Sequence, residues 1–251
     1  MRCLLCLTVS VLAACSPVSR TALTRTFRKL ESRFKHHAGF VLYNPEKDRI
    51  VFSYQGDRYF TPASNTKVLT FYTVLNVLGD SIPAMRYEIR NDSLIFCGTA
   101  DPSFLNPGTC RSPAVTNMLR SFQGGLYLAD NPLYAPPLGP GWAWSDYQYS
   151  YSAERSSFPV YGNYFTVARS PTGKTTVAPG FFKKYFRLAD STGRTMLLRE
   201  WQSNHLEYAP ARNLMRPEVW QVPFKASLTL TAELLQDTLK KRVEPLSRPY
   251  G

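Results

Sequence analysis

The sequence lacks any uninterrupted apolar run as long as a membrane-spanning helix, which takes about 20 residues. It therefore predicts that the chain is not an integral membrane protein. Acidic residues are also scarce, with 18 Asp and Glu against 30 Lys and Arg, so the formal net charge is +12. Such a surplus invites a nucleic-acid interpretation, but it also suits acidic lipid headgroups or anionic cell-wall polymer. The hydrophobic content of 44% excludes disorder throughout the 251 residues.

The N-terminus decides between these partners. Met1-Arg2 is a minimal positive region, and Cys3 to Ala14 is an apolar stretch too short to span a membrane, which is the pattern of a secretory signal. It ends in Leu12-Ala13-Ala14-Cys15, which resembles the lipobox of bacterial lipoproteins; an ordinary signal peptide before an incidental cysteine is the alternative. We expect residues 1–14 to be a lipoprotein signal peptide, Cys15 to be the lipid attachment site, and residues 15–20 to form a tether.

These expectations place the protein in the cell envelope. The sequence predicts an exported bacterial lipoprotein on the periplasmic face, held to the membrane by its lipid anchor and binding no nucleic acid. Ser16 after the lipidated cysteine is compatible with transport to the outer membrane.

The remaining thiols and imidazoles form no metal-binding pattern. Cys97 and Cys110 are the cysteines left after the signal and Cys15, and they either form a disulfide or stay as two free buried thiols. They form no C-x-x-C motif, and His36-His37 and His205 are isolated from one another. We therefore predict neither a metal site nor a cofactor.

Apolar periodicity predicts helices and hairpins in the first hundred residues. The expected elements are a helix over 21–35, a strand–turn–strand over 38–54, a helix over 67–78 and a hairpin over 87–96.

The second part of the chain has a different character. Residues 132–165 are crowded with proline and aromatic side chains, which predicts an irregular packed layer in preference to a ligand-facing aromatic wall. Residues 163–200 have the composition of strands and turns, 226–240 predict an amphipathic helix, and 243–251 predict a short proline-bearing tail.

Ser64-Asn65-Thr66-Lys67 is an S-x-x-K tetrad at the start of a predicted helix. The i, i+3 spacing puts the two side chains on one helical face, where the lysine can take the proton of a nucleophilic serine. A serine at this position can also be an ordinary N-cap, so the tetrad alone does not establish an enzyme.

Longer segments resemble a known family. Phe60 to Lys67 is similar to the active-site entry of the serine penicillin-binding proteins, and more narrowly of the D-alanyl-D-alanine carboxypeptidases/endopeptidases with a large insert after this helix. Gly98 to Leu105 resembles their Gly-x-Gly-Asp-Pro-x-Leu segment, with Ala100 in place of a glycine. The resemblance covers about residues 21–245 and includes the aromatic segments Trp142–Tyr147, Tyr151–Glu154 and Tyr161–Asn163.

The resemblance implies an α/β fold, with part of a penicillin-binding-protein/β-lactamase-like transpeptidase domain and a mostly β inserted domain. It implies the N-terminal half of the transpeptidase-like domain at 21–97, the insert at 98–225, and an amphipathic helix with a truncated tail at 226–251. Ser64 would form an acyl-enzyme with Lys67 as base and the Ser64 backbone N–H as part of the oxyanion hole. Peptidoglycan stem peptides would be the substrates, and β-lactam antibiotics covalent inhibitors.

The sequence departs from the family in two motifs. No S-x-N or K-T/S-G motif follows the insert. Tyr161-Gly162-Asn163 resembles a Y-x-N variant of the first motif, but it falls inside the insert. Gly173 to Thr176 contains the residues of the K-T/S-G motif in the wrong order. We therefore expect these 251 residues to resemble only the N-terminal portion of the family and to be weak or inactive alone. The alternative is a non-catalytic envelope lipoprotein that binds peptidoglycan or a protein partner. A β-lactamase is disfavoured because no Glu-bearing deacylation motif is evident.

Overall fold

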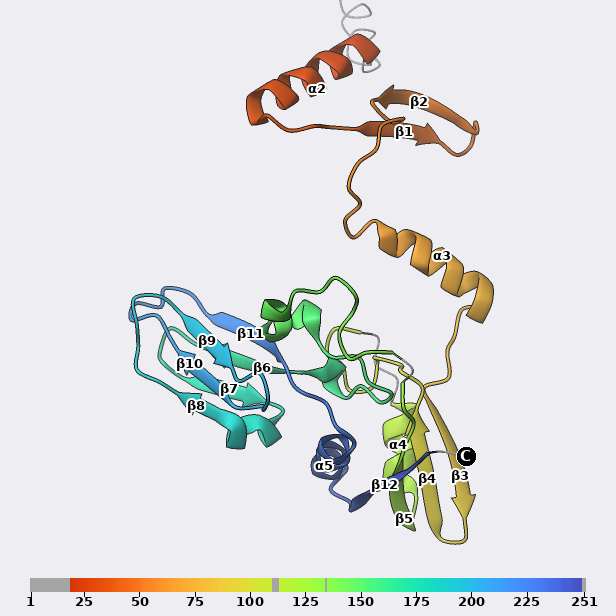
Figure 1. The fold of residues 1–251 in the computed structure, drawn as a ribbon, viewed down its shortest axis with the longest axis vertical. Helices are drawn as coiled ribbons and strands as arrows, with labels where there is room; N and C mark the ends of the chain where they lie inside the picture. The colour runs from red at the N-terminus through yellow and green to blue at the C-terminus, as the bar shows by residue number, and fades with distance from the viewer. Residues whose placement is uncertain (1–18, 110–112, 134, 250–251) are drawn as a thin grey trace, which may run out of the picture. The chain divides into compact units, whose positions relative to one another are not determined.

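The computed structural model describes residues 19–109, 113–133 and 135–249 (Figure 1). Its internal contacts divide the chain into two compact units, Met1–Val77 and Leu78–Gly251. Among the described residues, no helix is both long and apolar enough to cross a membrane. The signal sequence and the lipid attachment site predicted at Cys15 lie outside the described residues.

The first unit begins with a helix on a hairpin. Helix α2 (Arg20–Phe34) precedes the antiparallel strands β1 (Phe40–Asn44) and β2 (Arg49–Tyr54), as the sequence predicts. The Phe27 ring stacks on Phe40 and on Tyr54, each with centroids 5.2 Å apart. In the same contact, Glu31 of α2 accepts hydrogen bonds from the Tyr54 hydroxyl at 2.6 Å and the Ala38 N–H at 2.8 Å. One aromatic stack and one carboxylate therefore join the helix to the hairpin.

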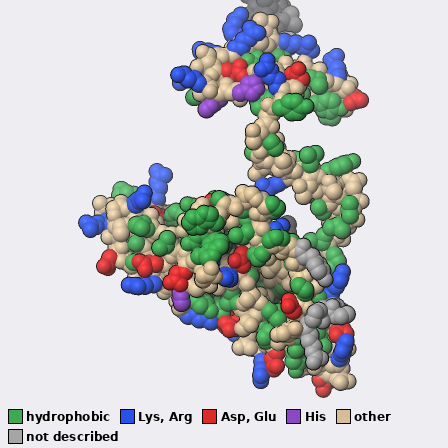
Figure 2. Space-filling model, viewed as in Figure 1, with side chains coloured by type: hydrophobic (Ala, Val, Ile, Leu, Met, Phe, Trp, Pro, Cys, Tyr) green, Lys and Arg blue, Asp and Glu red, His purple; other side chains and the backbone are tan. Residues whose placement is uncertain are grey.

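Helix α3 (Thr66–Leu78) ends this unit and is the second helix that the sequence predicts. Its sequence is apolar on almost every side, yet none of its residues is buried. Exposed fractions include 70% for Leu69, 64% for Phe71 and 73% for Val77. Hydrophobic side chains are visible on the surface of α3 in Figure 2. A helix that is apolar all round is normally found in the interior of a protein, so the exposure of α3 is unusual.

The second unit contains a four-stranded sheet in the order β12-β5-β4-β3. Strands β3 and β4 form the predicted hairpin, while β5 runs parallel to β4 and β12 runs parallel to β5. Parallel neighbours need crossover connections, and helices α4 and α5 lie in those two connections, with α5 packed on β5 and β12. The elements are β3 (Met85–Arg90), β4 (Ser93–Gly98), α4 (Ala114–Ser121), β5 (Gly125–Asp130), α5 (Leu228–Leu239) and β12 (Val243–Pro249).

Two three-stranded sheets form the rest of the second unit. One has the order β11-β6-β7 and is antiparallel; the other has the order β8-β10-β9, with β10 parallel to β8 and antiparallel to β9. Short 3-10 helices connect and flank them. The elements are η1 (Trp144–Gln148), η2 (Ser150–Ser152), η3 (Tyr161–Asn163), β6 (Tyr164–Arg169), β7 (Thr175–Ala178), η4 (Gly180–Tyr185), β8 (Phe186–Leu188), β9 (Met196–Arg199), β10 (Leu206–Ala209) and β11 (Glu218–Pro223).

A continuous hydrophobic core holds the second unit together. Leu94 and Phe96 of the four-stranded sheet belong to the same buried cluster as Phe165, Tyr208 and Leu235. The cluster therefore reaches from α5 to both three-stranded sheets.

The α/β class predicted from the sequence is confirmed, and one local prediction is wrong. The tail expected over 243–251 is strand β12, in which Pro245 pairs in register with Leu128 of β5. Proline has no backbone N–H to donate to a neighbouring strand, so within sheets it is largely confined to edge strands. Strand β12 is an edge strand, and this explains why prolines did not exclude a strand there.

The proline- and aromatic-rich segment is irregular, as predicted, but only part of it is packed. Phe158 is buried and lies against Phe96 and Phe104 with edge-on ring geometry. Trp144 and Tyr151 are 76% and 68% exposed. The predicted domain boundary at 97/98 stays a prediction; by contacts, the β3–β4 hairpin that precedes it is part of the second unit.

Candidate active site

The structure brings together the serine and the lysine of the S-x-x-K tetrad. Ser64 lies in the turn that precedes α3, and Lys67 is the second residue of the helix. The Lys67 ammonium group donates a hydrogen bond to Ser64 Oγ at 2.9 Å. The backbone supports the same approach, since the Lys67 N–H donates to the Ser64 carbonyl at 3.1 Å. The two side chains are therefore within hydrogen-bond reach of each other, as a nucleophile and its base must be, and we call them the Ser64–Lys67 dyad.

Two neighbours close the turn that holds the dyad. Asn65 Oδ1 accepts a hydrogen bond from the Ala63 N–H at 2.9 Å, and Thr66 Oγ1 donates to the Ala63 carbonyl at 3.0 Å. Sequence reasoning did not assign a role to either residue. The signal was available, because Asn and Thr side chains commonly bond to the nearby backbone in turns before helices.

The surroundings of the dyad are open. Both side chains are exposed, and Lys67 has no ion pair among the described residues. The Ser64 backbone N–H has no hydrogen-bond partner in the described part of the chain, so it is free to bind a developing oxyanion. The N-terminal end of the α3 dipole lies beside Ser64 and favours negative charge there.

The segment that resembles Gly-x-Gly-Asp-Pro-x-Leu is a tightly packed turn after β4. A side chain at Gly98 would place its Cβ 2.2 Å from the Ser157 carbonyl, so only glycine fits. Ala100, at the position of the family's second glycine, has φ +64°, a left-handed conformation that favours glycine. Asp101 accepts two hydrogen bonds from Ser103, from its N–H at 2.9 Å and its hydroxyl at 2.8 Å. The motif is explained by backbone geometry.

The two segments that partly resemble the missing motifs, Tyr161–Asn163 and Gly173–Thr176, have structural explanations as well. Asn163 is 2% exposed; its Nδ2 donates to the Glu154 carbonyl and to Ser156 Oγ, each at 2.8 Å. Lys174 lies in the turn between β6 and β7 and is exposed. Asn163 therefore holds together the irregular segment, and Lys174 is a loop residue.

Of the two cysteines predicted to remain after the signal and Cys15, only Cys97 lies within the described residues. Cys97 in β4 is buried, and burial raises the pKa of its thiol above the usual value. Cys110 lies outside the described residues, so its pairing with Cys97 stays a prediction. Among the residues that the structure describes, no group of three potential ligands could hold a metal ion.

Residues 23–181, which contain the dyad, match the D-Ala-D-Ala carboxypeptidase 3 (S13) family. The chain belongs to the S13 family. The chain is also 26% identical over 155 residues to the D-alanyl-D-alanine carboxypeptidase of Actinomadura sp. (strain R39), in an alignment that covers 57% of this chain and 29% of that protein.

Solved structures confirm the fold. Penicillin binding protein 4 from Haemophilus influenzae matches with a TM-score of 0.61 at 19% identity, over 86% of this chain and 54% of that one. Its complex with a β-lactam matches with a TM-score of 0.50 at 17% identity, over 84% of this chain and 52% of that one. The S13 chain described here thus spans about half the length of these structures and less than a third of the curated relative.

Proposed function

We propose that this chain carries the nucleophile and the base of a serine D-alanyl-D-alanine carboxypeptidase/endopeptidase that acts on peptidoglycan stem peptides. The 2.9 Å hydrogen bond between Lys67 Nζ and Ser64 Oγ, at the start of α3 in an S13-family chain, is the observation that carries the proposal.

The proposed chemistry is acyl transfer through Ser64. Its Oγ attacks the carbonyl carbon of the penultimate D-alanine, and the unprotonated Lys67 amine takes the hydroxyl proton. The oxyanion forms beside the unpartnered Ser64 N–H and the N-terminus of α3. The C–N bond then breaks, and the terminal D-alanine leaves as an amine with a proton from the lysine. Water hydrolyses the remaining ester and regenerates Ser64. Carboxypeptidase and endopeptidase action share these steps and differ in the amine that leaves.

The described chain supplies only part of such a site. The sequence contains neither an S-x-N nor a K-T/S-G motif. Helix α3 is apolar but exposed along its length. We therefore propose that these 251 residues alone acylate slowly or not at all. A second oxyanion donor and a cation for the substrate carboxylate would both be needed for full activity.

The experiment is intact-mass analysis of the folded chain after prolonged exposure to benzylpenicillin. Ser64→Ala and Lys67→Ala are measured in parallel, with Ser81→Ala as a matched control at an exposed serine beyond α3. A single adduct that persists in Ser81→Ala, disappears in Ser64→Ala and forms far more slowly in Lys67→Ala supports the dyad.

The other outcomes are equally informative. An adduct retained in Ser64→Ala would overturn Ser64 as the nucleophile. Rapid stoichiometric acylation of the wild type would overturn the proposal that the chain is weak alone. No adduct on a folded chain would support that proposal and assign the full activity to a longer or assembled protein.

We also propose that the protein is an exported lipoprotein anchored through Cys15 at the periplasmic face of the envelope. The support is the sequence of residues 1–15. Metabolic labelling with a fatty acid should modify the wild type and leave Cys15→Ala unlabelled. Equal labelling of the two chains would contradict lipid attachment at this cysteine.

A further inference from the structure

A pocket of about 300 Å³ lies in the second unit, apart from the residues that the proposed acyl transfer uses. It is formed by the loop before η1, by η1 and η2, by the end of β9 with the following turn, and by the segment after β11. We call it the Arg199 pocket; its lining residues are Pro136, Pro137, Leu138, Tyr147, Ser152, Glu154, Arg199, Trp201 and Lys225. This volume is at the small end of the range for small-molecule sites.

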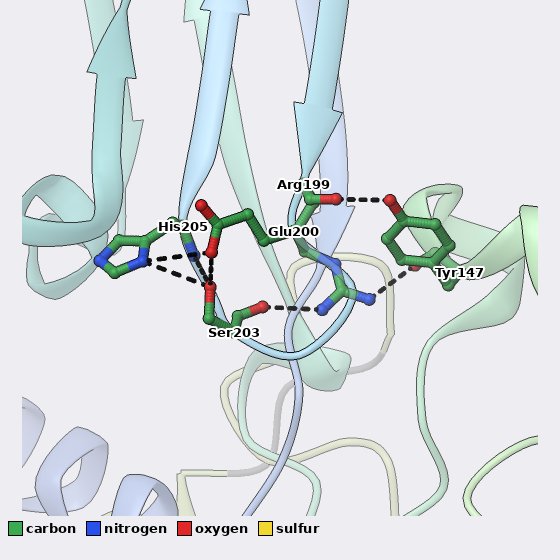
Figure 3. Close-up of polar contacts among 5 residues, drawn as sticks. All are labelled: Tyr147, Arg199, Glu200, Ser203 and His205. Atoms are coloured by element: carbon green, nitrogen blue, oxygen red, sulfur yellow. Dashed lines mark hydrogen bonds and ion pairs between the residues drawn. The ribbon is translucent and has the colours of Figure 1, made fainter.

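Arg199, the last residue of β9, is the most unusual member of the lining. It is 3% exposed, and no carboxylate lies within ion-pair distance of it among the described residues. Its two terminal nitrogens donate to the carbonyls of Ser203 and Tyr147, at 3.2 and 3.1 Å (Figure 3). Its Nε has no hydrogen-bond partner. The structure thus buries a positive charge that makes no direct ion pair, although the Glu154 carboxylate of the same pocket interacts with it electrostatically, and it leaves one of the guanidinium donors unused.

The rigid setting of this guanidinium indicates more than a chance burial. The Tyr147 hydroxyl donates to the Arg199 carbonyl at 2.5 Å, and the guanidinium carbon lies 4.9 Å from the centre of the Tyr147 ring. The Trp201 ring packs edge-on against the same tyrosine, with centroids 4.9 Å apart. Aromatic rings therefore hold the guanidinium in place before any ligand arrives.

Other polar groups of the pocket are also available. Ser152 is 2% exposed, and its hydroxyl has no hydrogen-bond partner. The exposed Lys225 adds a second cation; its Nζ donates to Gln202 Oε1 at 3.2 Å. Glu154 supplies a carboxylate, with Oε2 accepting from the Ala226 N–H at 3.0 Å.

Burying a cation without a direct ion pair is unfavourable, and a buried donor that makes no hydrogen bond is unfavourable as well. A planar carboxylate is the group that best matches a guanidinium, because it accepts charge-assisted hydrogen bonds in the same plane. The prolines, Leu138 and the aromatic rings leave room for a small apolar side chain beside it.

We propose that the Arg199 pocket binds the carboxylate of a small organic acid, of the size of an amino acid or a dipeptide. Arg199 and Lys225 provide the positive charge, Ser152 provides a hydroxyl, and Glu154 faces the amino end of a zwitterionic ligand. The site needs neither Ser64 nor Lys67, so it stands apart from the proposed acyl transfer.

The test is isothermal titration of the full chain with acetate, alanine and alanyl-alanine, against alaninamide as the matched probe without a carboxylate. We expect saturable binding of the carboxylates and at least about tenfold weaker binding of alaninamide, as loss of a charged hydrogen-bond pair implies. Comparing alanine with alanyl-alanine separates a free amino acid from a peptide terminus as the source of the carboxylate.

Variants assign the binding to the pocket. Arg199→Met should weaken alanine binding at least about tenfold. Lys225→Met, at the exposed rim, should weaken it by a smaller factor, and this variant decides the matter if Arg199→Met fails to fold. Arg187→Met, an equally drastic change at an exposed arginine of β8, should bind as the wild type does.

Several results would overturn the proposal. These are equal affinity for alanine and alaninamide, equal affinity for alanine and inorganic phosphate, or unchanged binding in a folded Arg199→Met or in Lys225→Met. Ser64→Ala should bind alanine normally, so failure of this proposal and failure of the proposed acyl transfer are separate outcomes.

Discussion

Helices α3 and α5 are of nearly equal length and are both rich in leucine, yet they have opposite surroundings. None of the 13 residues of α3 is buried, whereas six of the 12 residues of α5 are. Helix α5 lies on β5 and β12, next to α4, and this sheet gives its apolar face something to cover. The comparison shows that apolar composition alone does not form a core. A helix contributes burial energy only where the topology supplies a second layer.

The same contrast separates the two candidate sites. The Ser64–Lys67 dyad lies at the start of α3, a helix with no buried residue. The Arg199 pocket lies in the packed unit, where the Tyr147 ring lies against the Arg199 guanidinium and Trp201 packs against that ring. Pre-organisation by packing is what a binding site needs, so binding at the Arg199 pocket should be observable even if the dyad is weakly active.

A matched pair of leucine truncations tests the contrast most strongly. Leu235→Ala in α5 removes a fully buried side chain and should lower the free energy of unfolding by about 2–5 kcal/mol. Leu69→Ala in α3, at a residue 70% exposed, should change it by less than about 0.5 kcal/mol. Denaturant unfolding followed by tryptophan fluorescence reports the first change, because all four tryptophans lie in the second unit.

Circular dichroism in the far ultraviolet reports the second change, since it detects loss of helix in α3. A loss of several kcal/mol in Leu69→Ala would break the comparison, because it would mean that α3 is covered in solution.

A matched pair of serines compares the starts of the same two helices. Ser227 Oγ accepts a hydrogen bond from the Leu230 N–H at 3.1 Å and caps α5. Ser64 Oγ accepts instead from the Lys67 side chain. Ser227→Ala should cost about 1 kcal/mol of stability without changing acylation, and Ser64→Ala should remove acylation without a comparable loss of stability. Thermal unfolding with penicillin labelling checks this; a similar stability loss in the two variants would make Ser64 an N-cap.

The packed unit also holds a strained residue whose removal should be favourable. Ala100 has φ +64°, and Ala100→Gly should stabilise the second unit by about 0.5–1 kcal/mol, since glycine adopts this conformation freely. Ala232→Gly in α5 is the control and should destabilise by about 1 kcal/mol or more, because glycine is unfavourable inside helices. If both substitutions lowered the free energy of unfolding measured with denaturant, strain at Ala100 would be contradicted.

The smallest expected effect concerns pH and the first unit. The Tyr54 hydroxyl and the Ala38 N–H hold the pKa of Glu31 below its ordinary value of 4.5. A carboxyl whose folded pKa is depressed stabilises above its unfolded pKa, and this contribution is lost as pH falls through the folded value. The contact between α2 and the hairpin should therefore weaken below about pH 4.5.

Amide exchange in α2 and the hairpin, measured by NMR across the acid range, checks this. Glu31→Gln should lose most of the pH dependence, while Glu46→Gln, in the exposed hairpin turn, should keep it. An unchanged acid response in Glu31→Gln would contradict the assignment.

Much of the fold could be predicted from local signals. The helix over 21–35, the two hairpins and the helix over 226–240 follow from apolar spacing and turn residues, and each is present. Helix α4 and strand β5 were not predicted, because they follow the Gly98–Leu105 segment as a short crossover without strong periodicity. Strand β12 was missed because its prolines indicate a coil unless its position at the edge of the sheet is known.

The sequence by itself determined the tetrad, its place at the start of a helix and the family, since all three depend on residues close together in the chain. Only the tertiary structure decided which apolar helix is buried and where the Arg199 pocket lies. Arg199, Ser152 and Lys225 come from three distant segments. The spacing of residues along the chain does not reveal that these segments meet, because the burial of Arg199 depends on how the sheets and loops pack.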